Sequence, residues 1–135
     1  MASDAGVWQC CSEPVNLVSY LCHARLQQPR DVYYIPDFVT EQQETLLADA
    51  IAADSRKWVQ LRGRRLQCHG GTVLPEGTLS EPLPGHLQRF CTYLCARGLQ
   101  PTNKSNWNHV LVNEYAPGEG IMPHCDGPLY LPMVV

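Results

Sequence analysis

The spacing of apolar residues changes along the chain, and this change limits the folds that the sequence can form. Within residues 41–53, apolar side chains recur every three or four positions after a capping box formed by Thr40 and Gln43. The same spacing returns in residues 87–94, after Pro84 and before Gly98, which suit the start and the end of a helix. From residue 107 to residue 115 the period is two, as in a strand. The sequence therefore predicts an α+β fold, with helices first and strands last.

The segments around these elements carry turn signals. Residues 32–35 are β-branched and aromatic and precede Pro36, so a short strand is expected there. Residues 58–66 alternate loosely around Gly63, which suits a hairpin tip, and Gly70 with Gly71 marks another turn. Residues 1–30 show no clean period, so we expect a loosely packed leader with little order.

Length and charge narrow the possible classes of protein. The 135 residues, of which 44% are hydrophobic, are enough for one core. A net charge of −3 excludes a basic clamp that coats nucleic acid unaided, so any nucleic-acid contact must come from a local patch. No apolar stretch approaches the roughly 20 residues of a bilayer span, so no membrane partner is expected.

The cysteines indicate a reducing environment. Seven is an odd number, which leaves at least one thiol unpaired in any disulfide scheme. We therefore expect a cytoplasmic and nuclear location. Cys91 and Cys95 are four residues apart on a predicted helix and could hold zinc, but small buried apolar side chains are more common at that spacing.

Four residues near the C-terminal end carry the candidate chemistry. Asn113 and Tyr115 share one strand face, where an amide and a phenol could bind a small polar ligand, although two exposed polar residues would look the same. His124 and Asp126 are also two residues apart, and a neutral nitrogen with a carboxylate oxygen suits Fe(II), Mn(II) or Zn(II). Each pair alone also occurs by chance, so the surrounding sequence is needed to decide whether these residues form a binding site.

The ordered run from Asn113 to Asp126 resembles the signature of AlkB-type Fe(II)- and 2-oxoglutarate-dependent dioxygenases. Its parts are Asn113-Glu114-Tyr115, Pro117-Gly118-Glu119-Gly120-Ile121 and Pro123-His124-Cys125-Asp126. Residues 33–38, 58–61, 70–71 and 87–90 look like one vertebrate subgroup of that family, so the resemblance spans residues 32–135.

This resemblance implies a double-stranded β-helix, or jelly roll, under an N-terminal α/β layer. Residues 31–105 would form the lid-like layer, and residues 106–135 would be the first strands of an incomplete β-helix. His124 and Asp126 match the first two iron ligands of the family, and Asn113 and Tyr115 match residues that hydrogen-bond 2-oxoglutarate. The implied reaction oxidises a C–H bond, commonly of an N-methyl group, as 2-oxoglutarate is converted to succinate. The implied substrates are nucleic acids or methylated proteins.

Two functional groups of the family are missing from the printed sequence. A second histidine ligand and an arginine that pairs with 2-oxoglutarate are expected after the His-x-Asp motif, but the nine residues that follow Asp126 include neither His nor Arg. We therefore expect an incomplete dioxygenase with little turnover. The alternative is a non-catalytic binding or regulatory fragment. His109 could replace the missing ligand, although an ordinary strand histidine is more common.

A cluster of arginines and one cysteine are two further features of possible functional interest. Arg62, Arg64 and Arg65 fall in the lid-like segment and could contact phosphate, although a solvated hairpin face explains them equally well. Cys125 stands where relatives of this kind carry an acidic residue, and its side chain is expected to point away from the metal.

Overall fold

The computed structural model describes residues 6–8, 13–22, 32–100 and 106–130. Within these residues the chain forms two α-helices, α1 (Glu41–Ala53) and α2 (Gly85–Ala96). Short 3-10 helices, η2 (Leu17–Tyr20) and η3 (Ser55–Lys57), lie before and after α1. The strands are β1 (Val59–Leu61), β2 (Arg64–His69), β3 (Gly71–Leu74), β4 (Gly77–Ser80) and β5 (Val110–Glu114). Parts of the predicted leader and the last five residues of the predicted β-helix segment lie outside the described ranges.

The capping box that the sequence predicts at the start of α1 is confirmed. The Thr40 hydroxyl accepts a hydrogen bond from the Gln43 backbone N–H at 3.2 Å, and the Thr40 N–H donates to Gln43 Oε1 at 2.9 Å. Such a cap stabilises a helix by about 1 kcal/mol. Gln43 Nε2 also donates to the Val7 carbonyl at 3.0 Å, so the cap ties residues 6–8 to the helix.

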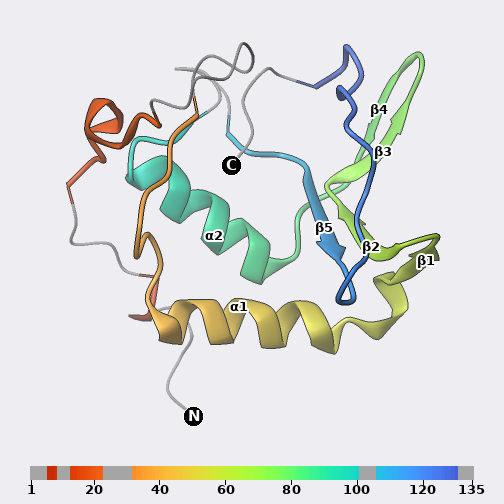
Figure 1. The fold of residues 1–135 in the computed structure, drawn as a ribbon, viewed down its shortest axis with the longest axis horizontal. Coiled ribbons are helices and arrows are strands. Elements are labelled where there is room, and N and C mark those ends of the chain that lie inside the picture. Colours follow the sequence, from red (N-terminus) through yellow and green to blue (C-terminus); the bar gives the residue numbers. More distant parts are fainter. Residues whose placement is uncertain (1–5, 9–12, 23–31, 101–105, 131–135) are drawn as a thin grey trace.

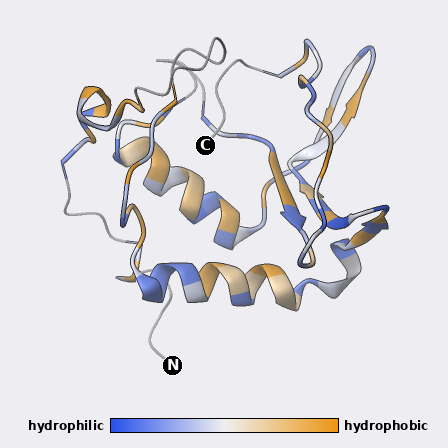
Figure 2. Cartoon of the chain, in the orientation of Figure 1, coloured by the Kyte–Doolittle hydropathy of each residue, from blue (hydrophilic) through white to orange (hydrophobic). Residues whose placement is uncertain are grey.

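The core lies mainly along α2. As predicted, this helix follows Pro84 and ends before Gly98, which has a φ of +81°. Apolar residues alternate with polar ones along both helices (Figure 2). The buried apolar residues expose at most 6% of their surface, and they are Leu87, Cys91, Tyr93, Leu94 and Leu99.

An aromatic cluster joins the N-terminal residues to α2. The Trp8 ring meets Phe90 and Tyr93 edge-on, with centroids 5.7 and 5.4 Å apart. Phe38 meets Tyr93 in the same way at 5.5 Å, and the Tyr93 hydroxyl donates to the Phe38 carbonyl at 2.9 Å. Trp8 belongs to the segment predicted as a leader, and it packs on the helical layer.

The strand predicted at residues 32–35 is wrong. Tyr33 forms only an isolated antiparallel bridge with Leu21, flanked by the hydrogen bonds Cys22 N to Val32 O and Tyr34 N to Tyr20 O. The β-branched and aromatic composition suits a strand, but a ladder also requires a neighbouring strand. Within the described residues, η2 ends directly before Leu21, and Pro36 follows the bridge at once.

The strands form two small antiparallel sheets, which confirms the α+β class. The predicted order, with helices first and strands last, is wrong, because β1–β4 lie between α1 and α2. One sheet has the order β1-β2-β5, and β3 pairs with β4 in a separate hairpin. Figure 1 shows the three-stranded sheet beside the end of α1 and the start of α2, and the β3-β4 hairpin projecting away from the helices. The predicted hairpin tip at Gly63 is confirmed between β1 and β2. The double-stranded β-helix stays a prediction. In the described part of the chain, no helix is long and apolar enough to cross a membrane.

Candidate metal and cofactor site

The register of β2 and β5 places Asn113 on a defined face of the sheet. Asn113 lies opposite Leu66, whereas Val112 lies opposite Gln67. Residues directly opposite each other share one face, so Asn113 and Gln67 point to different sides. The Gln67 side chain donates to the Ile51 carbonyl at the end of α1, at 2.9 Å. Asn113 therefore lies on the side of the sheet away from α1, and the predicted alternation along β5 is confirmed.

The side-chain oxygen of Asn113 is enclosed, and the described residues give it no hydrogen-bond partner. It is one of the buried side-chain atoms for which the described residues supply no donor. A buried polar atom left unpaired costs about 1–3 kcal/mol. The oxygen and nitrogen of an amide can exchange places by rotation, so Asn113 can offer an acceptor or a donor at this position. A polar ligand bound on this face would satisfy it.

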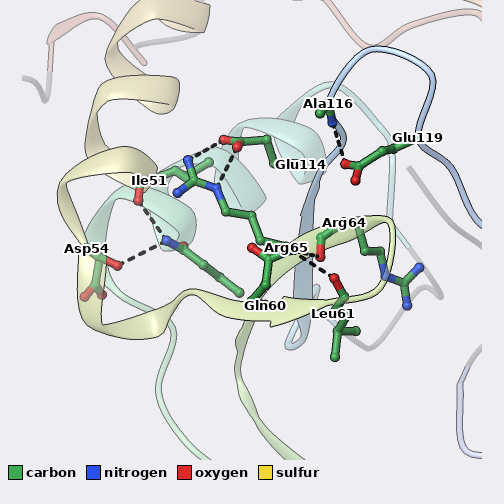
Figure 3. A network of polar contacts seen from close by, with 10 residues as sticks. Ile51, Asp54, Gln60, Leu61, Arg64, Arg65, Glu114, Ala116 and Glu119 are labelled. Carbon is green, nitrogen blue, oxygen red and sulfur yellow. Dashed lines mark hydrogen bonds and ion pairs between the residues drawn. The ribbon is translucent and has the colours of Figure 1, made fainter.

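Tyr115 follows β5 directly and precedes a tight turn. The Glu119 N–H donates to the Ala116 carbonyl at 2.9 Å, and Gly118 has a φ of +84°, as in the predicted type II turn. The Glu119 carboxylate accepts from the Ala116 N–H at 2.9 Å, which closes the turn (Figure 3). Tyr115 itself is 40% exposed. Among the described residues, no hydrogen bond joins it or Asn113 to His124 or Asp126.

His124 and Asp126 come together after this turn. Their side chains are about half exposed, and His124 Nε2 lies 3.8 Å from Asp126 Oδ1. The Met122 carbonyl lies 2.9 Å from His124 Nδ1. Because a carbonyl only accepts, Nδ1 is the donor, and in the neutral ring Nε2 then holds the lone pair, which is the arrangement that metal-bound histidines need.

The separation of this pair is compatible with two ligands of one metal ion. Ligand atoms at about 2.1 Å from one ion lie at most about 4.2 Å apart, and the observed separation of 3.8 Å falls within that limit. No group of three or more His, Cys, Asp or Glu side chains able to hold a metal occurs in the described ranges. His109, the proposed substitute ligand, instead contacts Cys68 and the Tyr130 ring.

An open groove of about 680 Å³ connects His124 with the tip of the β1-β2 hairpin. The hairpin tip and the segment after the tight turn lie close together, because a Cβ placed on Gly63 would be 3.2 Å from the Gly120 carbonyl. The charged or ionisable side chains that line this groove are Arg62, Arg64, Glu119 and His124. The basic hairpin therefore lies beside a candidate metal ligand that is far from it in sequence.

The three arginines of the predicted basic cluster do not act together. Arg65 forms two hydrogen bonds with Glu114, Nε to Oε1 at 2.6 Å and Nη2 to Oε2 at 2.7 Å, and its guanidinium lies 4.3 Å from the centre of the Trp58 ring. The hydrogen bond to Glu114 raises the pKa of Arg65. Only Arg62 and Arg64 face the groove. The sequence did not predict that Arg65 is paired while Arg62 and Arg64 face the groove, because the partner of Arg65 is 49 residues away.

The zinc hypothesis for α2 finds no support in the geometry. Cys91 is buried, and burial raises the pKa of its thiol to about 11, so it remains protonated at neutral pH. The Cys95 thiol lies 3.9 Å from Asn106 Oδ1. These two cysteines are therefore packing residues of the helix.

Comparison with known proteins places this chain in a family. No family model matches the chain. It is 48% identical over 125 residues to the probable RNA/DNA demethylase ALKBH6 of Danio rerio, which covers 92% of this chain and 51% of that protein. It is 33% identical over 122 residues to the alkylated DNA repair protein ALKBH8 homolog of Arabidopsis thaliana, covering 84% of this chain and 33% of that protein. It is 31% identical over 104 residues to the tRNA (carboxymethyluridine(34)-5-O)-methyltransferase alkbh8 of Xenopus tropicalis, covering 73% of this chain and 17% of that protein.

The chain belongs to the AlkB family. Its identity is higher with the zebrafish AlkB homologue 6, the subgroup to which the upstream segments bear a resemblance, than with the two ALKBH8 proteins. An alignment covering 92% of the chain also reaches into residues 1–30, where no resemblance was recognised from motifs. The chain spans about half the length of the zebrafish relative.

Proposed function

We propose that these residues contribute the first two iron ligands and the co-substrate residues of an AlkB-type 2-oxoglutarate-dependent oxygenase. One observation carries the proposal. The Met122 carbonyl accepts from Nδ1 of His124, so that in the neutral ring the lone pair of Nε2 lies on the side of Asp126, 3.8 Å away. This is the tautomer in which a histidine can bind a metal through Nε2.

The described residues have distinct proposed roles. His124 and Asp126 hold Fe(II), and Asn113 with Tyr115 orients 2-oxoglutarate. Bound iron and 2-oxoglutarate together supply the oxidation of a C–H bond, with succinate as co-product. The enclosed Asn113 oxygen, unpaired among the described residues, gains a partner when a polar co-substrate binds on the outer sheet face. In the neutral imidazole, the Met122 carbonyl selects the tautomer of His124 in which Nε2 can bind a metal.

We further propose that β5 and the segment after it begin a double-stranded β-helix, with residues 31–105 as the layer above its opening. Two protein ligands leave iron weakly held within these residues, so little turnover is expected from the 135 residues alone. The alternative is a binding or regulatory function without turnover. It is supported by the lack of a third metal ligand in the described part of the chain. The odd cysteine count continues to favour the cytoplasm and nucleus.

We test iron binding with the 135-residue chain and its single variants. Fe(II) affinity should fall by about tenfold or more in His124→Ala and in Asp126→Ala, since each removes a ligand. Cys125→Ser is the matched control, because it changes the residue between the two ligands and should leave the affinity unchanged. Equal iron affinity in the chain and both ligand variants would overturn the metal assignment.

A second measurement separates an oxygenase from a binding protein. Succinate is quantified after incubation with Fe(II), ascorbate, 2-oxoglutarate and a methylated oligonucleotide. Succinate above the His124→Ala level supports an oxygenase assembled by these residues and contradicts the proposed incompleteness. Succinate at the His124→Ala level supports an incomplete site if iron binding still depends on His124 and Asp126. The 135 residues would then bind iron without turnover.

A nucleic-acid substrate is the third part of the proposal. The names of the relatives refer to RNA, DNA and tRNA. Arg62 and Arg64 face the groove that contains His124, where they can attract a phosphate backbone. The single variants Arg62→Ala and Arg64→Ala should each weaken oligonucleotide retention at low salt and flatten its salt dependence. Arg65→Ala is the matched control, because the Arg65 charge is already paired with Glu114. An equal loss of oligonucleotide retention in all three variants would show that the net charge of the chain, and not the position of each arginine, determines binding.

A further inference from the structure

A cysteine and a histidine outside the family signature meet on the outer face of the sheet. Cys68 Sγ lies 3.3 Å from His109 Nε2. Cys68 is on β2 opposite Leu111, and His109 directly precedes β5. The two residues are 41 positions apart in sequence, so only the pairing of β2 with β5 brings them together.

The surroundings of the pair suit a proton transfer from sulfur to nitrogen. Cys68 is exposed to solvent, and its only other polar contact among the described residues is the Gly71 carbonyl at 3.6 Å. The Tyr130 ring covers His109 edge-on, with centroids 5.7 Å apart. Burial lowers the pKa of His109, which keeps the imidazole in the neutral form whose free nitrogen can accept the thiol hydrogen. A thiol within hydrogen-bond reach of a neutral imidazole is the arrangement of activated cysteine nucleophiles.

We propose that Cys68 is a nucleophilic thiol activated by His109, and that hydrogen peroxide oxidises it to a sulfenic acid. His109 Nε2 takes the thiol proton, and the thiolate sulfur attacks one peroxide oxygen. The S–O bond forms as the O–O bond breaks, and the departing hydroxide takes up a proton to become water. Sulfur loses two electrons and peroxide gains them. The site does not depend on iron or on 2-oxoglutarate.

The chain contains its own comparison thiol. Cys125 is also exposed, and no described imidazole or carbonyl lies within hydrogen-bond reach of its sulfur. If exposure alone determined reactivity, Cys68 and Cys125 would react alike. If the imidazole contact determines it, Cys68 reacts faster.

The experiment uses the 135-residue chain with a chelator present, treated with limiting hydrogen peroxide and dimedone, a reagent that traps sulfenic acids. Peptide mass spectrometry then measures the labelling of each cysteine over time. Cys68 should be labelled about tenfold faster than Cys125, and His109→Gln should reduce the ratio to about twofold or less. Cys68→Ser should remove the fast phase.

Unfolding in urea should make the two thiols equivalent, because it separates Cys68 from His109. This control needs no variant, so it tests whether the fold causes the faster labelling of Cys68 even if His109→Gln does not fold. Equal labelling of Cys68 and Cys125 in the folded chain would overturn the proposal. A ratio that persists in urea, or in a folded His109→Gln variant, would overturn it as well.

Discussion

Arg65 and Glu114 face each other across β2 and β5 and form two parallel hydrogen bonds of 2.6 and 2.7 Å (Figure 3). The two residues are direct partners in the strand register. A shift of one residue would separate them and would also move Asn113 to the other side of the sheet. The pair therefore helps to define the face on which the proposed co-substrate residue lies.

The first prediction concerns acid sensitivity. The hydrogen bond from Arg65 holds the pKa of Glu114 below its ordinary value of 4.5. A carboxylate whose pKa is lowered by folding contributes its full stabilisation above its unfolded-state pKa, and the contribution is lost as the pH falls through the folded-state pKa. The urea midpoint of the chain should therefore fall more steeply than that of Glu114→Gln between about pH 5 and pH 3. Glu76→Gln on the β3-β4 turn is the control. Parallel profiles for the chain and Glu114→Gln would contradict a role for the pair.

The second prediction compares two glutamines that make similar hydrogen bonds at different depths. Gln67 is fully buried, and its Nε2 donates to the carbonyls of Ile51 and Asp54 at 2.9 and 3.2 Å. Gln60 is exposed and donates to the carbonyls of Leu61 and Arg64. Gln67→Leu leaves the buried His69 Nε2 without its partner, whereas the Ile51 and Asp54 carbonyls keep backbone donors, and it should lower the free energy of unfolding by about 1–3 kcal/mol. Gln60→Leu should change it by about 0.5 kcal/mol or less. Urea unfolding of both variants measures the difference, and similar losses would contradict this account.

The sequence predicted the parts of the fold that depend on neighbouring residues. The capping box at Thr40, the hairpin tip at Gly63 and the turn at Gly118 all formed as expected. Each depends on interactions within about four residues, which the sequence displays directly. The predicted strand around Tyr33 failed because it needed a distant partner strand, which composition does not reveal.

The site could be predicted only in part, for the same reason. The two-residue spacing of His124 and Asp126 is visible in the sequence, and the structure brings their side chains within 3.8 Å. The pairing of Arg65 with Glu114 and the contact of Cys68 with His109 span 49 and 41 residues. Both contacts arise from the register of β2 against β5, which no local pattern specifies.

The third prediction concerns two glycines with positive φ. A Cβ on Gly70 would lie 2.0 Å from the Asn108 carbonyl oxygen, and the φ of Gly70 is +96°. Gly118 also has a positive φ, of +84°, but a Cβ there meets nothing within 4 Å. Gly118→Ala should therefore cost about 1 kcal/mol from backbone strain alone. Gly70→Ala should cost about 2 kcal/mol more, because the backbone of Asn108 and His109, just before β5, must move. Thermal or urea unfolding that ranks the two variants equally would show that the close approach is easily relieved.

The fourth prediction concerns stability near neutral pH. His69 is buried at the end of β2, with Nε2 donating to Gln67 Oε1 at 2.9 Å. Burial, followed by the charge of Lys57, lowers the pKa of His69 below its ordinary value of 6.5. The unfolded chain therefore binds a proton at a higher pH than the folded chain does. Stability should be complete above about pH 6.5 and should decline as the pH falls toward the folded-state pKa.

The matched variants His69→Gln and His109→Gln measure how much each histidine contributes to this loss of stability at lower pH. Burial also lowers the pKa of His109, so each variant should remove part of the slope of stability between about pH 7.5 and pH 5.5. His69→Gln should also lower stability at pH 7.5, because a glutamine cannot reproduce the ring packing at a site where only 3% of the residue is exposed. His109 is less buried, and its replacement should cost less there. Urea midpoints measured across this range test both effects, and a slope that survives in the double variant would assign the decline to other groups.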